Sequence, residues 1–124
     1  MKNSTDQIHS LGLKFGLYGD SGTATCSGFP GSAGYEKVDA AALAAWGVDY
    51  WKYDNCNVQV SGKCARFCCV CFKLMVLSPG NSSVRYITMR DALLAESHHI
   101  LYSLCNWGAD AVWEWGANVG NSWR

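Results

Sequence analysis

An α/β fold built on parallel strands is predicted by the order of residue patterns along this chain. A strand-like stretch over residues 12–20 is followed by a glycine-rich loop, a helical stretch over 35–46 and a second strand-like stretch from Tyr50. A strand, a helix and a strand in that order form a βαβ unit, whose strands are parallel and whose crossover is right-handed. A third strand-like stretch over 100–104, after a helical stretch over 85–97, extends the same sheet.

Each of these stretches has its own periodicity. The first strand alternates Leu13, Phe15 and Leu17 with other residues. The helix over 35–46 is predicted to bury the apolar positions that recur every three or four residues. These positions are Val38, Ala41, Ala42, Ala45 and Trp46. Gly47 is expected to end this helix, because glycine readily adopts the left-handed conformation found after many helices.

The composition excludes two classes of partner. The chain has 124 residues, a formal net charge of zero and only 16% charged residues. Nucleic acids and anionic membranes are bound by basic patches, so neither is an expected partner. The sequence contains no apolar run near the ~20 residues of a membrane-spanning helix, and no signal peptide is visible. The seven cysteines are an odd number, so at least one is free or pairs outside the chain.

Lys52 and Asp54 form the first candidate site. They lie two residues apart in the second strand, so their side chains point to the same face. A cation near a carboxylate lowers its pKa, and Lys52 is therefore expected to keep Asp54 ionised. An ionised carboxylate can act as a nucleophile, a base or a metal ligand. The alternative is a strand end capped by two surface charges, since charged residues are mostly exposed. His9 fits no pattern and is interpreted as a surface residue.

Three separated blocks of the sequence resemble one enzyme family. They are GLKFGLYGDSGTATC at 12–26, YWKYDNC at 50–56, and LYSLCNWG at 101–108, which is followed by NSWR at 121–124. Over residues 8–58 and 84–124 the chain resembles the α-galactosidases (melibiases) of glycoside hydrolase family twenty-seven, in particular the secreted fungal enzymes. The resemblance implies a partial (β/α)8 TIM barrel, with roughly three to four strands of parallel sheet and flanking helices. It also implies retaining hydrolysis of terminal α-linked galactose from oligosaccharides and galactomannans, secretion, and no cofactor or metal ion.

The resemblance also implies roles for individual residues. Asp54 matches the catalytic nucleophile, at the C-terminal end of a barrel strand, where such barrels place their chemistry. Lys52 and Tyr18 match contacts to the sugar, although ordinary packing is the alternative for Tyr18. Cys26 and Cys56 match a disulfide that ties together two loops beside the pocket. The remaining matches to substrate-binding positions are Cys26, Asn106, Trp107 and Arg124.

The sequence departs from the family at both ends. A retaining glycosidase needs a second carboxyl group to protonate the departing oxygen. In the family this group follows the matching arginine by a few residues, and the sequence given stops at Arg124. The acidic pair that grips the sugar hydroxyls would precede Met1, and Asp110 and Glu114 are not in matching positions. We therefore expect residues 1–124 to be an incomplete catalytic domain, without appreciable glycosidase activity of its own.

Residues 59–80 are a further departure, an atypical cysteine-rich insertion. Its cysteines are Cys64, Cys68, Cys69 and Cys71. Their C-x3-C-C-x-C spacing, with no histidine nearby, does not favour a zinc site. Additional disulfides, or a segment that is not selected for folding, are the alternatives.

A non-catalytic protein is the competing functional class. Such a protein would bind galactose or other partners through Lys52, Tyr18 and Trp107 but would lack groups for proton transfer. The aglycone preference and the number of subunits stay open.

Overall fold

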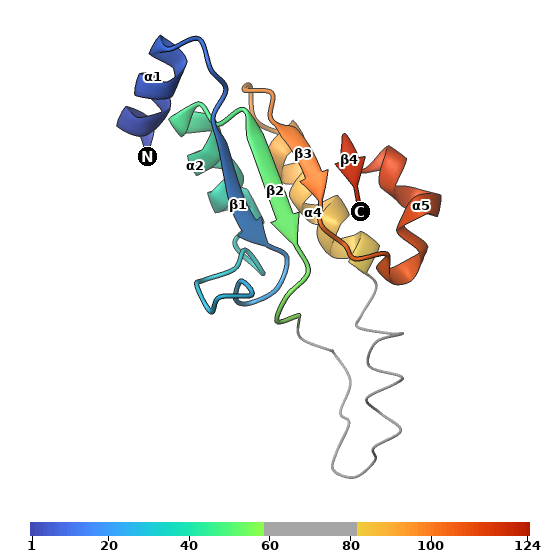
Figure 1. Cartoon of the computed structure of the whole chain (residues 1–124). Coiled ribbons are helices and arrows are strands. Elements are labelled where there is room, and N and C mark those ends of the chain that lie inside the picture. The colour runs from blue at the N-terminus through green and yellow to red at the C-terminus, as the bar shows by residue number, and fades with distance from the viewer. Residues whose placement is uncertain (59–81) are drawn as a thin grey trace.

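A parallel sheet with helices on one face organises the computed structural model, which describes residues 1–58 and 82–124 (Figure 1). The strands are β1 (Gly16–Asp20), β2 (Tyr50–Asp54), β3 (Leu101–Leu104) and β4 (Ser122–Trp123). They lie side by side in the order β1-β2-β3-β4, and every neighbouring pair is parallel. The predicted α/β class is therefore confirmed. The first strand is shorter than expected, and β4 comes from the tail, where the residue pattern predicted no element.

One helix precedes the first strand, and the other helices lie in the connections between the strands. The helices are α1 (Lys2–Ser10), α2 (Glu36–Trp46), α4 (Ser82–Leu94) and the short α5 (Val112–Trp115), with single 3₁₀ turns at Ala109–Ala111 and Gly116–Asn118. Helices α2 and α4 contact each other and cover the same face of the sheet (Figure 1). Gly47 ends α2 with a left-handed φ of 74°, as predicted. In the described residues no helix has the length and apolar character needed to cross a membrane.

The core lies between the sheet and these two helices. Side chains alternate along the strands, so Trp51 and Tyr53 of β2 point toward the helices and are buried. They pack with apolar residues of the helices and of β3: Leu43, Tyr86, Met89, Tyr102 and Leu104. On the opposite face Tyr18, Tyr50 and Leu101 are 43%, 37% and 46% exposed. This uncovered face carries Lys52, and also Asp54 at the C-terminal end of β2.

The buried face of α2 differs from the predicted one. Ala40 and Leu43 are buried, whereas Val38 is 66% exposed and Ala41 and Ala45 are also exposed. Alanine occurs on every side of this helix, so the spacing of apolar residues does not select a single face. The large side chain of Leu43, which packs into the core, sets the orientation instead.

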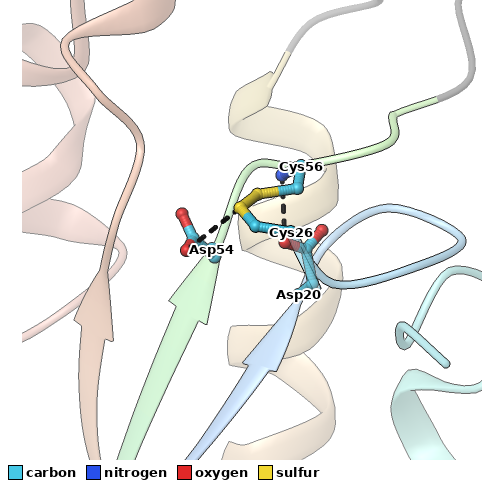
Figure 2. A group of neighbouring side chains, drawn as sticks. All are labelled: Asp20, Cys26, Asp54 and Cys56. Atoms are coloured by element: carbon cyan, nitrogen blue, oxygen red, sulfur yellow. Dashed lines mark hydrogen bonds between the residues drawn. A yellow bond between two sulfur atoms is a disulfide. The ribbon is translucent and has the colours of Figure 1, made fainter. Parts of the chain in front are cut away.

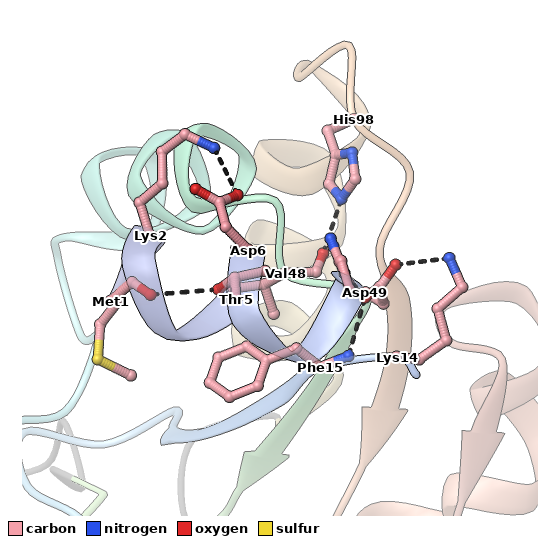
Figure 3. A network of polar contacts seen from close by, with 10 residues as sticks. Met1, Lys2, Thr5, Asp6, Lys14, Phe15, Val48, Asp49 and His98 are labelled. Carbon is pink, nitrogen blue, oxygen red and sulfur yellow. Dashed lines mark hydrogen bonds and ion pairs between the residues drawn. The ribbon is translucent and has the colours of Figure 1, made fainter. Parts of the chain in front are cut away.

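The carboxylate of Asp49 joins α1 to the start of the sheet. Its Oδ2 accepts the backbone N–H of Phe15 at 2.9 Å, and its Oδ1 accepts Lys14 Nζ at 2.8 Å (Figure 3). The same Oδ2 lies 2.6 Å from His9 Nε2. The prediction that His9 is a surface residue is confirmed, because its side chain is 36% exposed, and its ring also has a partner in Asp49. This cluster lies at the N-terminal ends of β1 and β2.

Candidate functional site

Asp54 is the last residue of β2, so it lies at the C-terminal ends of the strands, away from the Asp49 cluster. The side chain of Tyr18 on β1 contacts it there. The Tyr18 hydroxyl donates a hydrogen bond to Asp54 Oδ2 at 2.7 Å, and the backbone N–H of Asn55 donates to Oδ1 at 3.0 Å. The strands are parallel, with Tyr18 opposite Lys52 and Asp20 opposite Asp54, so their C-terminal ends lie together. Asp54 is only 7% exposed, and its carboxylate is therefore held rather than freely solvated.

Hydrogen-bond donors keep this carboxylate ionised. Burial raises the pKa of Asp54, but hydrogen bonds from the side chains of Tyr18 and Cys105 oppose that effect. The backbone N–H of Asn55 and the side chain of Trp107 act in the same direction. The net pKa lies below the ordinary value for an aspartate, because hydrogen bonds to the charged form favour it.

Lys52 acts on Tyr18, which corrects the expected cause of this ionisation. No ion pair joins Lys52 to Asp54 among those of the described residues. Lys52 Nζ instead lies 5.8 Å from the centre of the Tyr18 ring, within the range of a cation–π contact. Burial, together with the hydrogen bond to Asp54, raises the pKa of Tyr18 to about 12. The Tyr18 hydroxyl therefore keeps its proton at neutral pH and remains a donor.

A disulfide between Cys26 and Cys56 joins the loops that follow β1 and β2, as the resemblance implied (Figure 2). The Cys26 sulfur lies 3.8 Å from Asp54 Oδ2. A disulfide sulfur carries no proton, so this is a contact rather than a hydrogen bond. It places the bridge directly beside the carboxylate.

Asp20 is a second tie between these loops, and the sequence analysis did not identify it. Its Oδ2 accepts the N–H of Cys56 at 2.9 Å (Figure 2). Its Oδ1 accepts the N–H of Gly22 at 2.8 Å. Asp20 is fully buried, and burial raises its pKa. The signal that could have found it is the turn Gly19-Asp20-Ser21-Gly22 at a strand end, where an aspartate commonly bonds to nearby backbone N–H groups.

The carboxylates of Asp20 and Asp54 and the sulfurs of Cys26 and Cys56 lie within 4.8 Å of one another. This group does not suit a metal ion, because the two sulfurs are joined in the disulfide and cannot act as thiolates. Nor does it suit a pair of catalytic carboxyls. Asp20 is 0% exposed and both of its oxygens accept backbone N–H groups.

Arg85 at the start of α4 supports the same loops and was also missed. Its Nη2 donates to Asn55 Oδ1 at 2.7 Å, and its Nε lies 3.4 Å from Ser21 Oγ. Asn55 in turn donates from Nδ2 to the backbone oxygen of Asn106 at 3.3 Å. The residue that follows Asp54 is thereby connected to α4 and to the loop after β3.

The remaining predicted residues come from the segment after β3. Trp107 is 58% exposed, whereas Asn106 is fully buried and donates from Nδ2 to Ser82 Oγ at 2.9 Å. The backbone oxygen of Arg124 accepts the N–H groups of both residues, and Arg124 Nε lies 3.3 Å from Cys105 Sγ. The structure therefore places Trp107 and Arg124 at the surface near Asp54 but turns the Asn106 side chain inward.

The cysteine-rich insertion at 59–80, with Cys64, Cys68, Cys69 and Cys71, lies outside the described residues. The interpretations of that segment stay predictions.

Comparison with known sequences places the chain in one family. Residues 1–120 match the melibiase family described as alpha galactosidase A. The protein named "Probable alpha-galactosidase B" from Penicillium simplicissimum is 47% identical over 137 residues, which cover 96% of this chain and 32% of that protein. Alpha-galactosidase mel1 of Schizosaccharomyces pombe is 46% identical over 119 residues, which cover 95% of this chain and 24% of that protein. The chain thus spans about a quarter to a third of the length of these relatives.

Solved structures agree with the sequence comparison. The alpha-galactosidase of Saccharomyces cerevisiae superposes with a TM-score of 0.80 at 39% identity, over 99% of this chain and 24% of that one. Alpha-galactosidase I of Mortierella vinacea gives a TM-score of 0.79 at 44% identity, over 99% of this chain and 28% of that one. The four-stranded parallel sheet is accordingly part of a (β/α)8 barrel. This chain belongs to the melibiase family of alpha-galactosidases.

Proposed function

We propose that Asp54 is the nucleophile of a retaining α-galactosidase site. The observation that carries the proposal is the hydrogen bond of 2.7 Å from Tyr18 to an Asp54 carboxylate of lowered pKa, at the C-terminal end of a barrel strand. A nucleophilic carboxylate must be ionised and fixed in direction, and this contact serves both needs. Barrels of this class carry their catalytic groups at that end of the strands.

The chemistry follows from the two-step route of retaining glycosidases. An Asp54 oxygen forms a bond to the anomeric carbon while the bond from that carbon to the departing oxygen breaks, giving a galactosyl ester. Water then hydrolyses the ester in a second step that needs a general base. Asp20 is not suited to that role, because it is fully buried and both oxygens accept N–H groups.

Terminal α-linked galactose is the proposed substrate group. The relatives are alpha-galactosidases by name, and one solved structure of the Saccharomyces cerevisiae enzyme contains raffinose. Trp107, 58% exposed, offers an apolar face to a sugar ring, and Lys52 and Arg124 offer donors to its hydroxyls. Asn106 is proposed to support the loop rather than to touch the sugar, because its side chain is buried against Ser82.

The proposal is tested with α-galactosyl fluoride. Fluoride leaves with its bonding electron pair and without needing a proton, so the first step depends on the nucleophile and not on a general acid. Intact-mass spectrometry of the 124-residue chain should show the addition of one galactosyl group, and peptide mapping should place it on Asp54.

Two variants give this test its controls. Asp54→Asn should abolish the addition, because an amide is a poor nucleophile, whereas Glu114→Gln, at an exposed position of α5, should leave it unchanged. Addition that persists in Asp54→Asn would refute the proposal. Binding of galactose by isothermal titration, without any labelling of the wild type, would favour the non-catalytic sugar-binding alternative.

Secretion is part of the same proposal. Disulfides form and persist in oxidising compartments such as the secretory pathway, and the bridge between Cys26 and Cys56 fits that environment. Mass spectrometry of the chain recovered from its native source, with and without reductant, would test whether the bridge is formed.

A further inference from the structure

Cys105 directly follows β3 and is a free cysteine among the described residues. It is only 1% exposed, so its sulfur faces other protein groups rather than solvent. The sequence comparison assigns it no role, and it was not among the candidate residues of the sequence analysis.

The register of the sheet sets Cys105 beside Asp54. Tyr53 pairs with Leu104 across the parallel strands β2 and β3, so Asp54 and Cys105 are the next positions on neighbouring strands. The N–H of Cys105 donates to the Tyr53 oxygen at 2.8 Å, which continues the pairing by one residue. Side chains alternate between the faces of a sheet, so Asp54 and Cys105 leave it on the same side.

A second contact fixes the sulfur from the other direction. Arg124 follows β4 and places its Nε 3.3 Å from Cys105 Sγ, where the guanidinium donates and the sulfur accepts. The backbone N–H of Arg124 donates to the Leu104 oxygen at 3.1 Å, so the backbones at this point are paired as well. The guanidinium of Arg124 therefore holds the sulfur at the position next to Asp54 across the β2–β3 pairing.

We propose that the Cys105 thiol is a positioning residue, which holds the Asp54 carboxylate from the β3 side and links it to the Arg124 guanidinium. Its catalytic meaning rests on the proposed function of Asp54, but the contact can be measured without any substrate. Tyr18 donates to the same carboxylate from the β1 side at 2.7 Å. Donors on both sides restrict rotation of the carboxylate, so that one oxygen faces outward at the C-terminal ends of the strands.

The polarity of the link suits this role. The thiol accepts from Arg124 and can then donate its own proton to Asp54, and consecutive hydrogen bonds strengthen one another. The lowered pKa of Asp54 agrees with a donor at this position. The other charged or ionisable groups around Asp54 are Lys52 on the same face of β2, and Tyr18, Asp20, Tyr86 and Arg124. A substitution of Cys105 replaces none of them.

The test follows the carboxyl carbon of Asp54 by NMR during a pH titration of the ¹³C-labelled chain. Cys105→Ala should raise the midpoint by about one pH unit, the size expected for a lost hydrogen bond to a charged group. Cys105→Ser keeps a donor and should shift it by less than half as much. Ser103→Ala is the matched control, because Ser103 lies on the same face of β3 but contacts Ser122.

Arg124→Lys covers the case in which Cys105→Ala fails to fold. Arg124 is exposed, and lysine keeps the charge but lacks the Nε–H group that reaches the sulfur. This variant should raise the midpoint of Asp54 by a smaller but measurable amount. The proposal is overturned if Cys105→Ala shifts the midpoint no more than Ser103→Ala does, or, where Cys105→Ala does not fold, if Arg124→Lys leaves it unchanged.

The labelling reaction separates this inference from the proposed function. If α-galactosyl fluoride labels the wild type, Cys105→Ala should move the pH dependence of labelling upward together with the NMR midpoint, which a merely structural role would not do. If the wild type is not labelled but the NMR shift is present, the positioning contact stands and the proposed function fails. Labelling without any NMR shift would refute the positioning role alone.

Discussion

Asp49→Asn should destabilise the chain more than any comparable change to an exposed acidic residue. The Asp49 carboxylate accepts the Phe15 N–H and contacts both Lys14 and His9, at 2.6–2.9 Å, with its side chain only 13% exposed. An asparagine keeps one acceptor oxygen and turns an N–H group toward a donor. A hydrogen bond to a charged group contributes about 1.5–3 kcal/mol, and an exposed ion pair below about 1 kcal/mol. We therefore expect a loss of about 2–3 kcal/mol at neutral pH.

The pH dependence of this loss has a definite sign. Burial raises the pKa of Asp49, but the hydrogen bonds from Lys14, Phe15 and His9 outweigh it, and the net pKa is well below its ordinary 3.8. A carboxylate with a lowered folded-state pKa contributes its full stability above the unfolded value and loses it as the pH falls through the folded value. The difference between wild type and Asp49→Asn should thus persist from pH 7 to about pH 4 and narrow only below that.

The assay is urea unfolding at several pH values, with Asp6→Asn as the matched control. Asp6 pairs with Lys2 at 3.0 Å, but both side chains are more than half exposed, and such pairs contribute little. Its removal should change the free energy of unfolding by less than about 0.5 kcal/mol. If Asp49→Asn costs no more than Asp6→Asn at pH 7, the assignment of Asp49 as the anchor of α1 is wrong.

Three further changes test other parts of the structure. Tyr18→Phe removes a donor from Asp54 and should raise the carboxyl midpoint by about one pH unit, read by the same NMR titration, and an unchanged midpoint would exclude the contact. Met89→Ala, in the centre of the core, should cost about 2–5 kcal/mol in urea unfolding, whereas Val84→Ala, at a 55% exposed position of the same helix, should cost less than about 1 kcal/mol. Asp110→Ala removes the carboxylate that accepts the first N–H of α4 at 2.7 Å and should cost about 1 kcal/mol; equal stability would show that water replaces the cap.

Much of the architecture follows from local sequence patterns. The order of strand, loop and helix predicted a parallel sheet, and Gly47 marked the end of α2, because glycine tolerates the left-handed conformation there. The orientation of α2 was not predictable from spacing, since alanines surround it. The strand β4 was missed because it has only two residues, too few to show a residue pattern, and it is defined by its pairing with β3.

The candidate site was predicted only as far as its motifs extend. The family resemblance predicted that Tyr18 and Asp54 belong to one site. The structure shows that the Tyr18 hydroxyl donates a hydrogen bond to Asp54 at 2.7 Å. Asp20 and Arg85 were missed, because their partners are backbone groups and side chains from distant segments. Lys52 was assigned to the wrong partner. Its position two residues from Asp54, on the same face of β2, suggested an ion pair between them. The long lysine side chain instead reaches the Tyr18 ring on the neighbouring strand.

The loops beside Asp54 are fastened by two means that fail under opposite conditions. A reductant that opens the bridge between Cys26 and Cys56 does not affect the hydrogen bonds of Asp20, and acid that protonates Asp20 spares the bridge. Because neither tie requires the other, we expect the Asp20 hydrogen bonds to bring the two loops together before the disulfide forms. Such an order would favour the pairing of these two cysteines among the seven in the chain.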